Sequence, residues 1–559
     1  MPVKSRLLIA IPLIAALGAL PVPRTVEAEP VAPAADRTDL PPDPGFAALN
    51  QMITMDPDAA LTRIGRLLEA LQAEETSDPQ VIFDLYAAAA DLMIEGGAAA
   101  QAAQVLAQLA DFAARFRLEV DHDPIPLYAQ AAAMLEDTGQ PEAAQEALLA
   151  LLAEERAGGL APAETAPTRA ALVRIARALG RSEPEVPAAP ATGPINRATI
   201  LYATDRARGD SRRPQSFYGA GRGPLELGRA EVSLPVTAEE RAVLRQVAPL
   251  SAEAFDSALA GAAAPDLLVV VPGYNSSFEQ SARHAAQLAR DLRLDGAVLL
   301  LSWASAGTRL GYLSDTATVR LSGRNLAHLL RQVAPRVAPG HLHLLAEGLG
   351  AQALADALEL IGAGANPPPL GQVFFVTPDL DADLFRAMLP AIQPLAARVT
   401  LYTSDRSSAL EVARPIYGPA LRAGEGEAIL LRAPGLDSID VSALGRLPLR
   451  PEVVLEADGA SRVAPETLVA DIAALLWRNA PPAARCGLVA ADDLAETGWR
   501  VTVGAPGACK DPAWPALLGA LRRSGAATLP EAEAVLRRNI TDPELRKKMQ
   551  PAITRLLGE

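Results

Sequence analysis

Between residues 198 and 403, short apolar runs alternate with helical stretches, and this alternation restricts the fold more than any other feature of the chain. Continuous apolar strands joined by crossover helices are typical of a mostly parallel sheet covered on both faces. The sequence therefore predicts an α/β domain over residues 197–480. Its expected strands are residues 198–203, 230–236, 266–271, 297–303, 341–346, 372–376 and 398–403, and its expected helices are residues 278–292, 319–337, 351–361 and 382–392.

Two Pro- and Ala-rich segments, residues 29–43 and 182–196, have the composition of linkers. Between them, residues 44–181 place Ala and Leu at three-to-four spacing with Gly and Pro breaks, which predicts short antiparallel helices. The segment from Tyr86 to Met93 recurs 42 residues later, from Tyr128 to Leu135, and a glycine follows each copy. These helix pairs resemble diverged tetratricopeptide repeats.

Stacked helix pairs present a concave surface that commonly binds a peptide or a partner protein. Residues 44–181 are therefore expected to bind such a partner. The alternative is a helical cap or spacer that binds nothing.

The first residues have the pattern of a secretory signal peptide. Lys4 and Arg6 precede an apolar run from Leu7 to Leu20, and small residues lie before an expected cleavage site near Ala28. The run is too short to span a bilayer as a helix. We expect residues 1–28 to be removed and the mature chain, without a transmembrane segment, to be periplasmic or secreted. An uncleaved membrane anchor is the alternative.

Export makes the two cysteines informative, since paired cysteines commonly bridge in an oxidising compartment. Cys486 and Cys509 lie 23 positions apart in the last part of the chain. They are expected to form a disulfide, with two buried thiols as the alternative. Residues 481–559 are otherwise expected to form a small helical unit, with helices at residues 514–524, 529–539 and 546–557.

Charge and composition exclude several functional classes. The formal net charge is −15, and no segment clusters Lys and Arg with aromatic residues, which argues against nucleic-acid binding. Five His and two Cys leave little room for zinc clusters or haem attachment. The sequence therefore predicts no metal and no cofactor.

Several motifs in order along the chain resemble a bacterial family of esterase/lipase-like α/β-hydrolases of poorly known function. The resemblance covers residues 200–476 and implies an α/β-hydrolase fold. Its motifs are Leu201 to Arg206, Phe217 to Gly223, Gly228 to Pro235, Val271 to Phe278, Ser302 to Gly307 with Tyr312, Asp315 and Ser322, Pro378 to Asp381 with Phe385, and Leu401 to Ser404 with Ala409 and Leu410.

Catalysis on this fold needs a Ser on a strained strand-to-helix turn between small residues. The matching turn here is Ala346-Glu347-Gly348-Leu349-Gly350. The small flanks Ala346 and Gly350 are present, but the nucleophile position is Gly348, which has no oxygen. Glycine also relieves the backbone strain that a Ser would carry at that position.

The other catalytic positions are also changed. The acid position of the family falls on Ser407, and the base should follow it, yet the last His of the chain is His343. His284, His328, His341 and His343 are expected to be packing or surface residues. Pro272 stands where the family has a His before the oxyanion-hole glycine, and it removes a backbone N–H.

Two functions remain open. The first is an exported, non-catalytic protein whose hydrolase-like cleft binds a small ligand or nothing and whose helical repeats or domain faces bind a protein. The second is an exported serine hydrolase with a rearranged constellation of residues. The residues expected to line the cleft are Gly273, Tyr274, Asn275, Ser302, Ser305, Asp379 and Asp381.

Overall fold

The structure is a computed structural model. It describes residues 49, 52, 55–73, 79–116, 120, 122–157, 160, 162–182, 196–209, 213–234, 242–262, 266–294, 296–307, 311–407, 410, 413, 416–417, 420–426, 431–444, 464–491, 498–502, 511 and 513–558. The expected signal peptide, the linker at residues 29–43, residues 183–195 of the second linker and Cys509 lie outside the described residues. Contacts divide the chain into two units, with residues 1–193 in the first and most of the remainder in the second.

The first unit is helical, as expected. Two of its glycines, Gly97 and Gly139, follow helices with φ of +81° and +73°, a backbone conformation that favours glycine. They lie 42 residues apart, so the sequence repeat corresponds to two helix–turn–helix pairs, α4 with α5 and α6 with α7. The helices are α3 (Pro57–Ala73), α4 (Pro79–Glu95), α5 (Ala99–Arg115), α6 (Pro124–Asp137), α7 (Pro141–Ala157) and α8 (Ala166–Ala178).

Successive helices of this unit pack on one another, and their apolar faces form two cores. Residues of α5 belong to both cores: Val105 and Leu109 to the first, Ala103 and Ala110 to the second. Alanines on α5 and α6 allow these helices to approach closely. The unit therefore stacks its helices in chain order.

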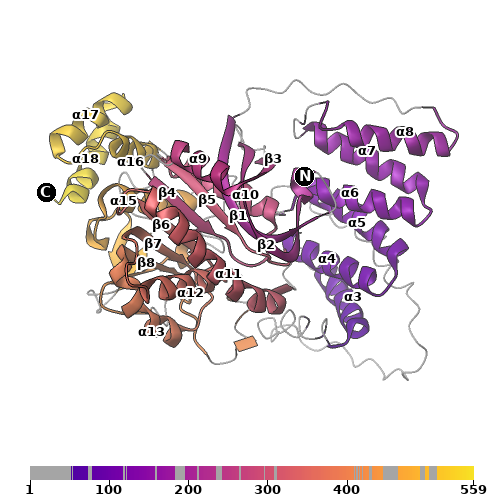
Figure 1. The fold of residues 1–559 in the computed structure, drawn as a ribbon, viewed down its shortest axis with the longest axis horizontal. Helices are drawn as coiled ribbons and strands as arrows, with labels where there is room; N and C mark the ends of the chain where they lie inside the picture. The colour runs from indigo at the N-terminus through magenta and orange to yellow at the C-terminus, as the bar shows by residue number, and fades with distance from the viewer. Residues whose placement is uncertain are drawn as a thin grey trace. The chain divides into compact units, whose positions relative to one another are not determined.

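The second unit is built on a mixed sheet that has eleven strands in the described residues, in the order β10-β11-β9-β8-β7-β6-β4-β5-β1-β2-β3. Figure 1 labels β1 to β8. The strands from β11 through β1 pair in parallel, and β2, β3 and β10 pair antiparallel at the two ends. The predicted fold class is therefore confirmed. The strands are β1 (Asn196–Arg208), β2 (Tyr218–Leu234), β3 (Val243–Leu250), β4 (Asp266–Val271), β5 (Gly296–Ser302), β6 (Leu342–Glu347), β7 (Leu370–Val376), β8 (Ala396–Thr403), β9 (Leu436–Asp440), β10 (Leu488–Ala490) and β11 (Gly498–Val501).

Helices cover both faces of the sheet because the parallel strands are apolar on both sides. One face packs against α9 (Ala252–Ala262), α11 (Tyr312–Val333), α12 (Gly350–Gly362) and α13 (Ala382–Ile392). The other face packs against α10 (Phe278–Asp291) and α15 (Ala464–Arg478). Figure 1 shows α11, α12 and α13 together along the sheet. In the part of the chain that the structure describes, no helix combines the length and apolar character needed to cross a bilayer.

The C-terminal segment, expected to form a small helical unit, contains three α-helices and two short strands in its described residues. It supplies the edge strands β10 and β11 to the sheet, and its helices α16 (Ala513–Arg523), α17 (Leu529–Asn539) and α18 (Pro543–Leu557) share one core with β4, β5 and α15. Cys486 packs against this core, whereas the disulfide to Cys509 stays a prediction because Cys509 lies outside the described residues.

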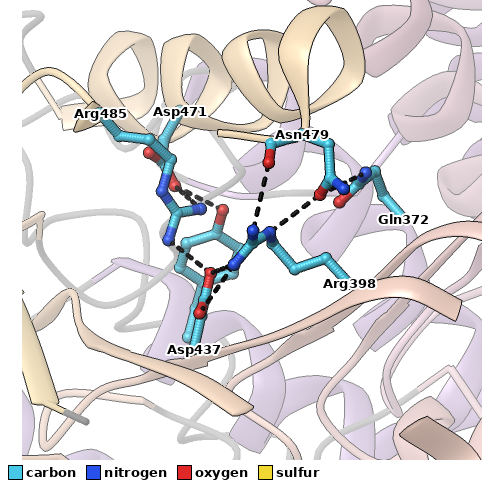
Figure 2. A network of polar contacts seen from close by, with 7 residues as sticks. Gln372, Arg398, Asp437, Asp471, Asn479 and Arg485 are labelled. Atoms are coloured by element: carbon cyan, nitrogen blue, oxygen red, sulfur yellow. Dashed lines mark hydrogen bonds and ion pairs between the residues drawn. The ribbon is translucent and has the colours of Figure 1, made fainter. Parts of the chain in front are cut away.

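A network of charged side chains fastens this segment to the amino-terminal half of strands β7 to β9 (Figure 2). Arg398 donates to both oxygens of Asp437, at 3.1 and 3.0 Å, and to Asn479. Arg485 contacts Asp437 at 3.2 Å and Asp471 at 3.3 Å. We call these residues, with Gln372 and Tyr402, the amino-edge network. Because Arg485 is fully buried, its two carboxylate partners are needed to offset the loss of its hydration.

A second polar cluster lies where β4 and β6 begin. The buried Asp266 contacts His341 at 2.7 Å and His343 at 3.2 Å and also contacts Arg522 of α16. His343 accepts the backbone N–H of Gln372 through Nδ1, at 2.9 Å, so its proton is on Nε2, facing Asp266. Burial lowers the pKa of His343 to about 3, which keeps this ring neutral.

Candidate functional site

The turn between β6 and α12 has the backbone geometry of a nucleophile elbow. Gly348 has φ of +48°. Its N–H donates to the carbonyl of Val376 at 3.0 Å, and its own carbonyl accepts the N–H of Asp379 at 2.9 Å. A side chain at this position would strain the backbone, and glycine removes that strain. The turn is therefore held in place, but the residue at its apex has no nucleophilic atom.

The small flanks of the turn are required by close packing. A Cβ on Gly350 would overlap the carbonyl oxygen of Pro272 and lie 2.9 Å from that of Val271. Gly273 also lies close to the turn, because a Cβ there would be 3.4 Å from the carbonyl oxygen of Glu347. The end of β4 and the start of α12 thus meet directly, as at the elbow of a hydrolase.

The structure brings one histidine to the elbow. His284 of α10 contacts Glu347 through Nε2, at 3.1 Å, and both side chains are nearly buried. Within the described residues, no Ser, Thr or Cys side chain hydrogen-bonds His284. The pair therefore joins α10 to the elbow but has no nucleophile to activate, although the sequence had indicated a plain packing role for His284.

The remaining histidines lie elsewhere. His343 is five residues before Gly348 on an extended strand, which places it about 16 Å away, at the amino-terminal ends of the strands. We call these ends the amino edge of the sheet. His328 is exposed on α11, and His122 belongs to the helical unit. Ser407, at the expected acid position after β8, is buried.

Ser302 and Ser305 belong to a buried polar network around Arg206. Arg206 donates from Nε to the Ser302 hydroxyl at 3.0 Å, and from its terminal nitrogens to the carbonyls of Ser305, at 2.9 Å, and Ser276. The Ser305 hydroxyl donates to Asp315 at 2.6 Å. Both serines thus help to hold β1, β5 and the start of α11 together.

Two aspartates balance the charge of Arg206. Asp205 accepts from Ser322, at 2.6 Å, and from the N–H of Ala304. Burial raises the pKa of Asp315 to about 6, even though Ser305 and the N–H of Ala306 donate to it. Burial lowers the pKa of Arg206 to about 10, so the guanidinium remains charged at neutral pH.

Asn275 also lies near the carboxyl ends of the parallel strands, which we call the carboxyl edge of the sheet. Its φ is +56°, and its side-chain oxygen Oδ1 is buried without a hydrogen-bond partner among the described residues. A left-handed conformation is unusual for a residue other than glycine, and Asn is one of the residues that tolerates it.

The two aspartates after β7 have different roles. Asp381 caps α13, since its side chain accepts the N–H groups of Asp383 and Leu384 at 3.0 and 2.9 Å. Asp379 is fully buried, contacts the Nε of Arg422 at 2.7 Å and accepts from the hydroxyl of Tyr312. Asp381 is therefore structural, whereas Asp379 holds a buried cation beside the elbow.

Three tyrosines surround this ion pair. The ring of Tyr312 lies 5.2 Å from that of Tyr274 and 6.4 Å from that of Tyr417. The guanidinium of Arg422 stacks over Tyr417 at 4.1 Å from the ring centre. We call Tyr274, Tyr312, Tyr417, Asp379 and Arg422 the carboxyl-edge cluster.

Sequence reasoning did not identify Arg422 or Tyr417 as site residues. They follow β8 in a stretch without a regular pattern, so no signal in the sequence distinguished Arg422 from a surface arginine. Arg206 stood in a motif but had no assigned role. Within the described ranges, no three His, Cys, Asp or Glu side chains are placed to hold a metal ion.

Comparison with known proteins supports the fold of this domain. Residues 251–441 match the family model described as "Alpha/beta hydrolase of unknown function (DUF900)". This range contains the elbow, Asp379 and Arg422. No curated protein and no solved structure matches the chain.

Proposed function

We propose that this chain is an exported, non-catalytic α/β-hydrolase-fold protein that acts by binding. The observation that carries the proposal is Gly348 at the apex of a preserved elbow. Acyl transfer by this fold needs a nucleophile there and a base within hydrogen-bond reach. The chain has neither at the family's positions, because Gly348 has no nucleophilic atom and no histidine follows His343, and Ser407 also replaces the acid.

The geometry weighs against the alternative of a rearranged serine hydrolase. The hydroxyls of Ser302 and Ser305 are engaged by Arg206 and Asp315, and no histidine contacts either serine in the described residues. A serine whose hydroxyl is held in a buried structural network, without a histidine in contact with it, is a poor nucleophile.

The helical unit supports a role in binding a protein or peptide. Its two glycine-terminated helix pairs agree with diverged tetratricopeptide-like repeats, which bind segments of other proteins on their concave side. Export by the N-terminal signal peptide and an oxidised Cys486–Cys509 pair complete the proposal. N-terminal sequencing of chain recovered from the periplasm or medium should begin near Glu29.

A fluorophosphonate tests the non-catalytic proposal without knowledge of a substrate. The intact mass of the purified chain should not change after reaction, while an active serine hydrolase treated in parallel gains one adduct. Addition to one serine of this chain would overturn the proposal and identify the nucleophile of the alternative. The variant Ser305→Ala then shows whether that serine carries the adduct.

A further inference from the structure

We propose that Arg422 is the anchor of a binding site for an organic monocarboxylate at the carboxyl edge of the sheet, next to the elbow. The inference rests on the proposed non-catalytic function and names the class of ligand for it.

The guanidinium of Arg422 is buried but only partly used. The whole residue is 3% exposed. Its Nε donates to Asp379, at 2.7 Å, while neither terminal nitrogen has a hydrogen-bond partner among the described residues. Both nitrogens keep some contact with solvent, so a ligand can reach them without displacing a structural partner. The terminal nitrogens are thus available to a ligand.

Arg422 is held rigidly in place. Asp379 fixes the Nε side, and the guanidinium lies over the ring of Tyr417. Asp379 itself is fixed by the hydroxyl of Tyr312 and by Gln352, which donates to its carbonyl at 2.8 Å. Such a preorganised fork loses little conformational entropy when it binds an anion.

A chain of contacts connects this fork to the elbow. The N–H of Asp379 donates to the carbonyl of Gly348, and Tyr312 packs against Tyr274, which follows Gly273. Gly273 in turn lies against the elbow, since a Cβ on Gly273 would be 3.9 Å from the Cα of Gly348. The anchor therefore belongs to the edge where ligands of open α/β sheets bind.

The charges weigh against a dianion. The planar fork of arginine suits a carboxylate or a phosphate. Asp379 already neutralises one positive charge, and Glu425 lies close enough to accept the backbone N–H of Arg422 at 3.2 Å. A dianion would leave an excess of buried negative charge, which is strongly unfavourable. A monocarboxylate adds the smallest charge.

The surroundings of the anchor favour an apolar chain on that carboxylate. Tyr312 and Tyr417 flank the ion pair. An aliphatic tail on the carboxylate can pack against the half-buried ring of Tyr417, which is favourable in proportion to the area buried.

Calorimetric titration of the purified full chain tests the site with octanoate, the uncharged 1-octanol and inorganic phosphate. Octanoate should bind one molecule per chain, and both other probes should bind at least about tenfold more weakly. The variant Arg422→Lys keeps a charge beside Asp379 but loses the fork, and should weaken octanoate binding by about tenfold. The double variant Arg422→Gln with Asp379→Asn avoids an unpaired buried carboxylate and should abolish binding.

Arg386→Gln is the matched control, because it removes one positive charge from α13, where Arg386 is exposed and pairs with Asp383. It should bind octanoate like the unmodified chain. Equal binding of octanol and octanoate, tighter binding of phosphate, unchanged affinity in both Arg422 variants or no binding at all would each overturn the site. Absence of binding in a chain that also resists the fluorophosphonate overturns this inference alone, whereas a serine adduct overturns the proposed function.

Discussion

Arginines are buried at both the amino edge and the carboxyl edge of the central sheet, but the two arginines have different numbers of carboxylate partners. At the amino edge, the terminal nitrogens of Arg485 contact Asp437 and Asp471 and tie the C-terminal segment to the strands, while its buried Nε has no partner in the described residues. At the carboxyl edge, Arg422 has one carboxylate partner and two terminal nitrogens without a partner in the described residues. The first arrangement stabilises the fold, and the second keeps binding capacity.

The elbow adds to this contrast. Its backbone is preserved around Gly348, and its packing against Pro272 still requires a small residue at Gly350. The elbow is thus complete in its backbone although Gly348 has no nucleophilic atom. Under the proposed function, the carboxyl edge positions a ligand without reacting with it.

Disruption of the amino-edge network should have the largest effect on stability. Arg485→Met leaves Asp471 and Asp437 without one cation, and Asp471 is buried at 4% exposure. The free energy of unfolding should fall by about 3–5 kcal/mol, measured by urea titration. Arg208→Met is the control, since Arg208 pairs with Glu226 but is 55% exposed, and it should lower the stability far less than Arg485→Met does. Equal losses of unfolding free energy in the two variants would contradict the stabilising role of the buried Arg485 contacts.

The predicted disulfide would fasten the segment that carries Arg485. If Cys486 and Cys509 are bridged, the double variant Cys486→Ser with Cys509→Ser should lower the free energy of unfolding by about 3 kcal/mol. Intact mass before and after reduction with alkylation measures the bridge directly. Two alkylations without prior reduction would contradict the predicted bond.

Substitutions at the elbow test how strongly the close packing at the carboxyl edge contributes to stability. Gly350→Ala forces the start of α12 away from Pro272 and should cost about 1–3 kcal/mol. Gly348→Ala strains only its own backbone and should cost about 1–2 kcal/mol. Thermal unfolding followed by circular dichroism measures both. Gly65→Ala is the control, because a Cβ at Gly65 meets nothing within 4 Å.

Gly348→Ser tests the chemistry of the same position. The structure supplies no base that reaches it from the family's position, so this variant should remain unlabelled by a fluorophosphonate. Its intact mass after reaction is the measurement. A serine adduct would show that the nearby pair of His284 and Glu347 can act as a base. A single substitution at Gly348 would then be enough to restore a reactive serine.

The smallest effect is a difference in pH dependence between the edges. Burial lowers the pKa of His343 to about 3, so between about pH 6.5 and 3 the unfolded chain binds a proton that the folded chain excludes. Stability at the amino edge therefore falls as the pH falls through this range. Burial raises the pKa of Asp315 to about 6, so between about pH 6 and 4 the folded chain holds the extra proton, and stability at the carboxyl edge rises as the pH falls.

Two variants separate these opposing contributions. When the pH is lowered from about 7 to about 5, His343→Gln should lose about 1–2 kcal/mol less stability than the unmodified chain, because it lacks the buried histidine. Asp315→Asn should gain about 1–2 kcal/mol less stability than the unmodified chain over the same change. Urea titrations at the two pH values measure the change. The same change in both variants would show that neither group titrates as its burial indicates.

The sequence predicted much of the sheet. The strand at residues 266–271 has the predicted limits, and the helix at residues 382–392 does as well. Both are strongly apolar and bounded by breaking residues. By contrast, β10 has three residues and β9 carries two aspartates, so neither has a hydrophobic period that a sequence could display.

The sequence by itself determined the fold class, the helical unit and the absence of a nucleophile at Gly348, because these depend on local periodicity and on the identity of one residue. Only the tertiary structure decided how the charges are used. It brought His284 to Glu347, engaged Ser302 with Arg206 and left Arg422 on Asp379 with its terminal nitrogens open. Those contacts join residues up to 96 positions apart, and long-range pairing of polar groups leaves no periodic trace in the chain.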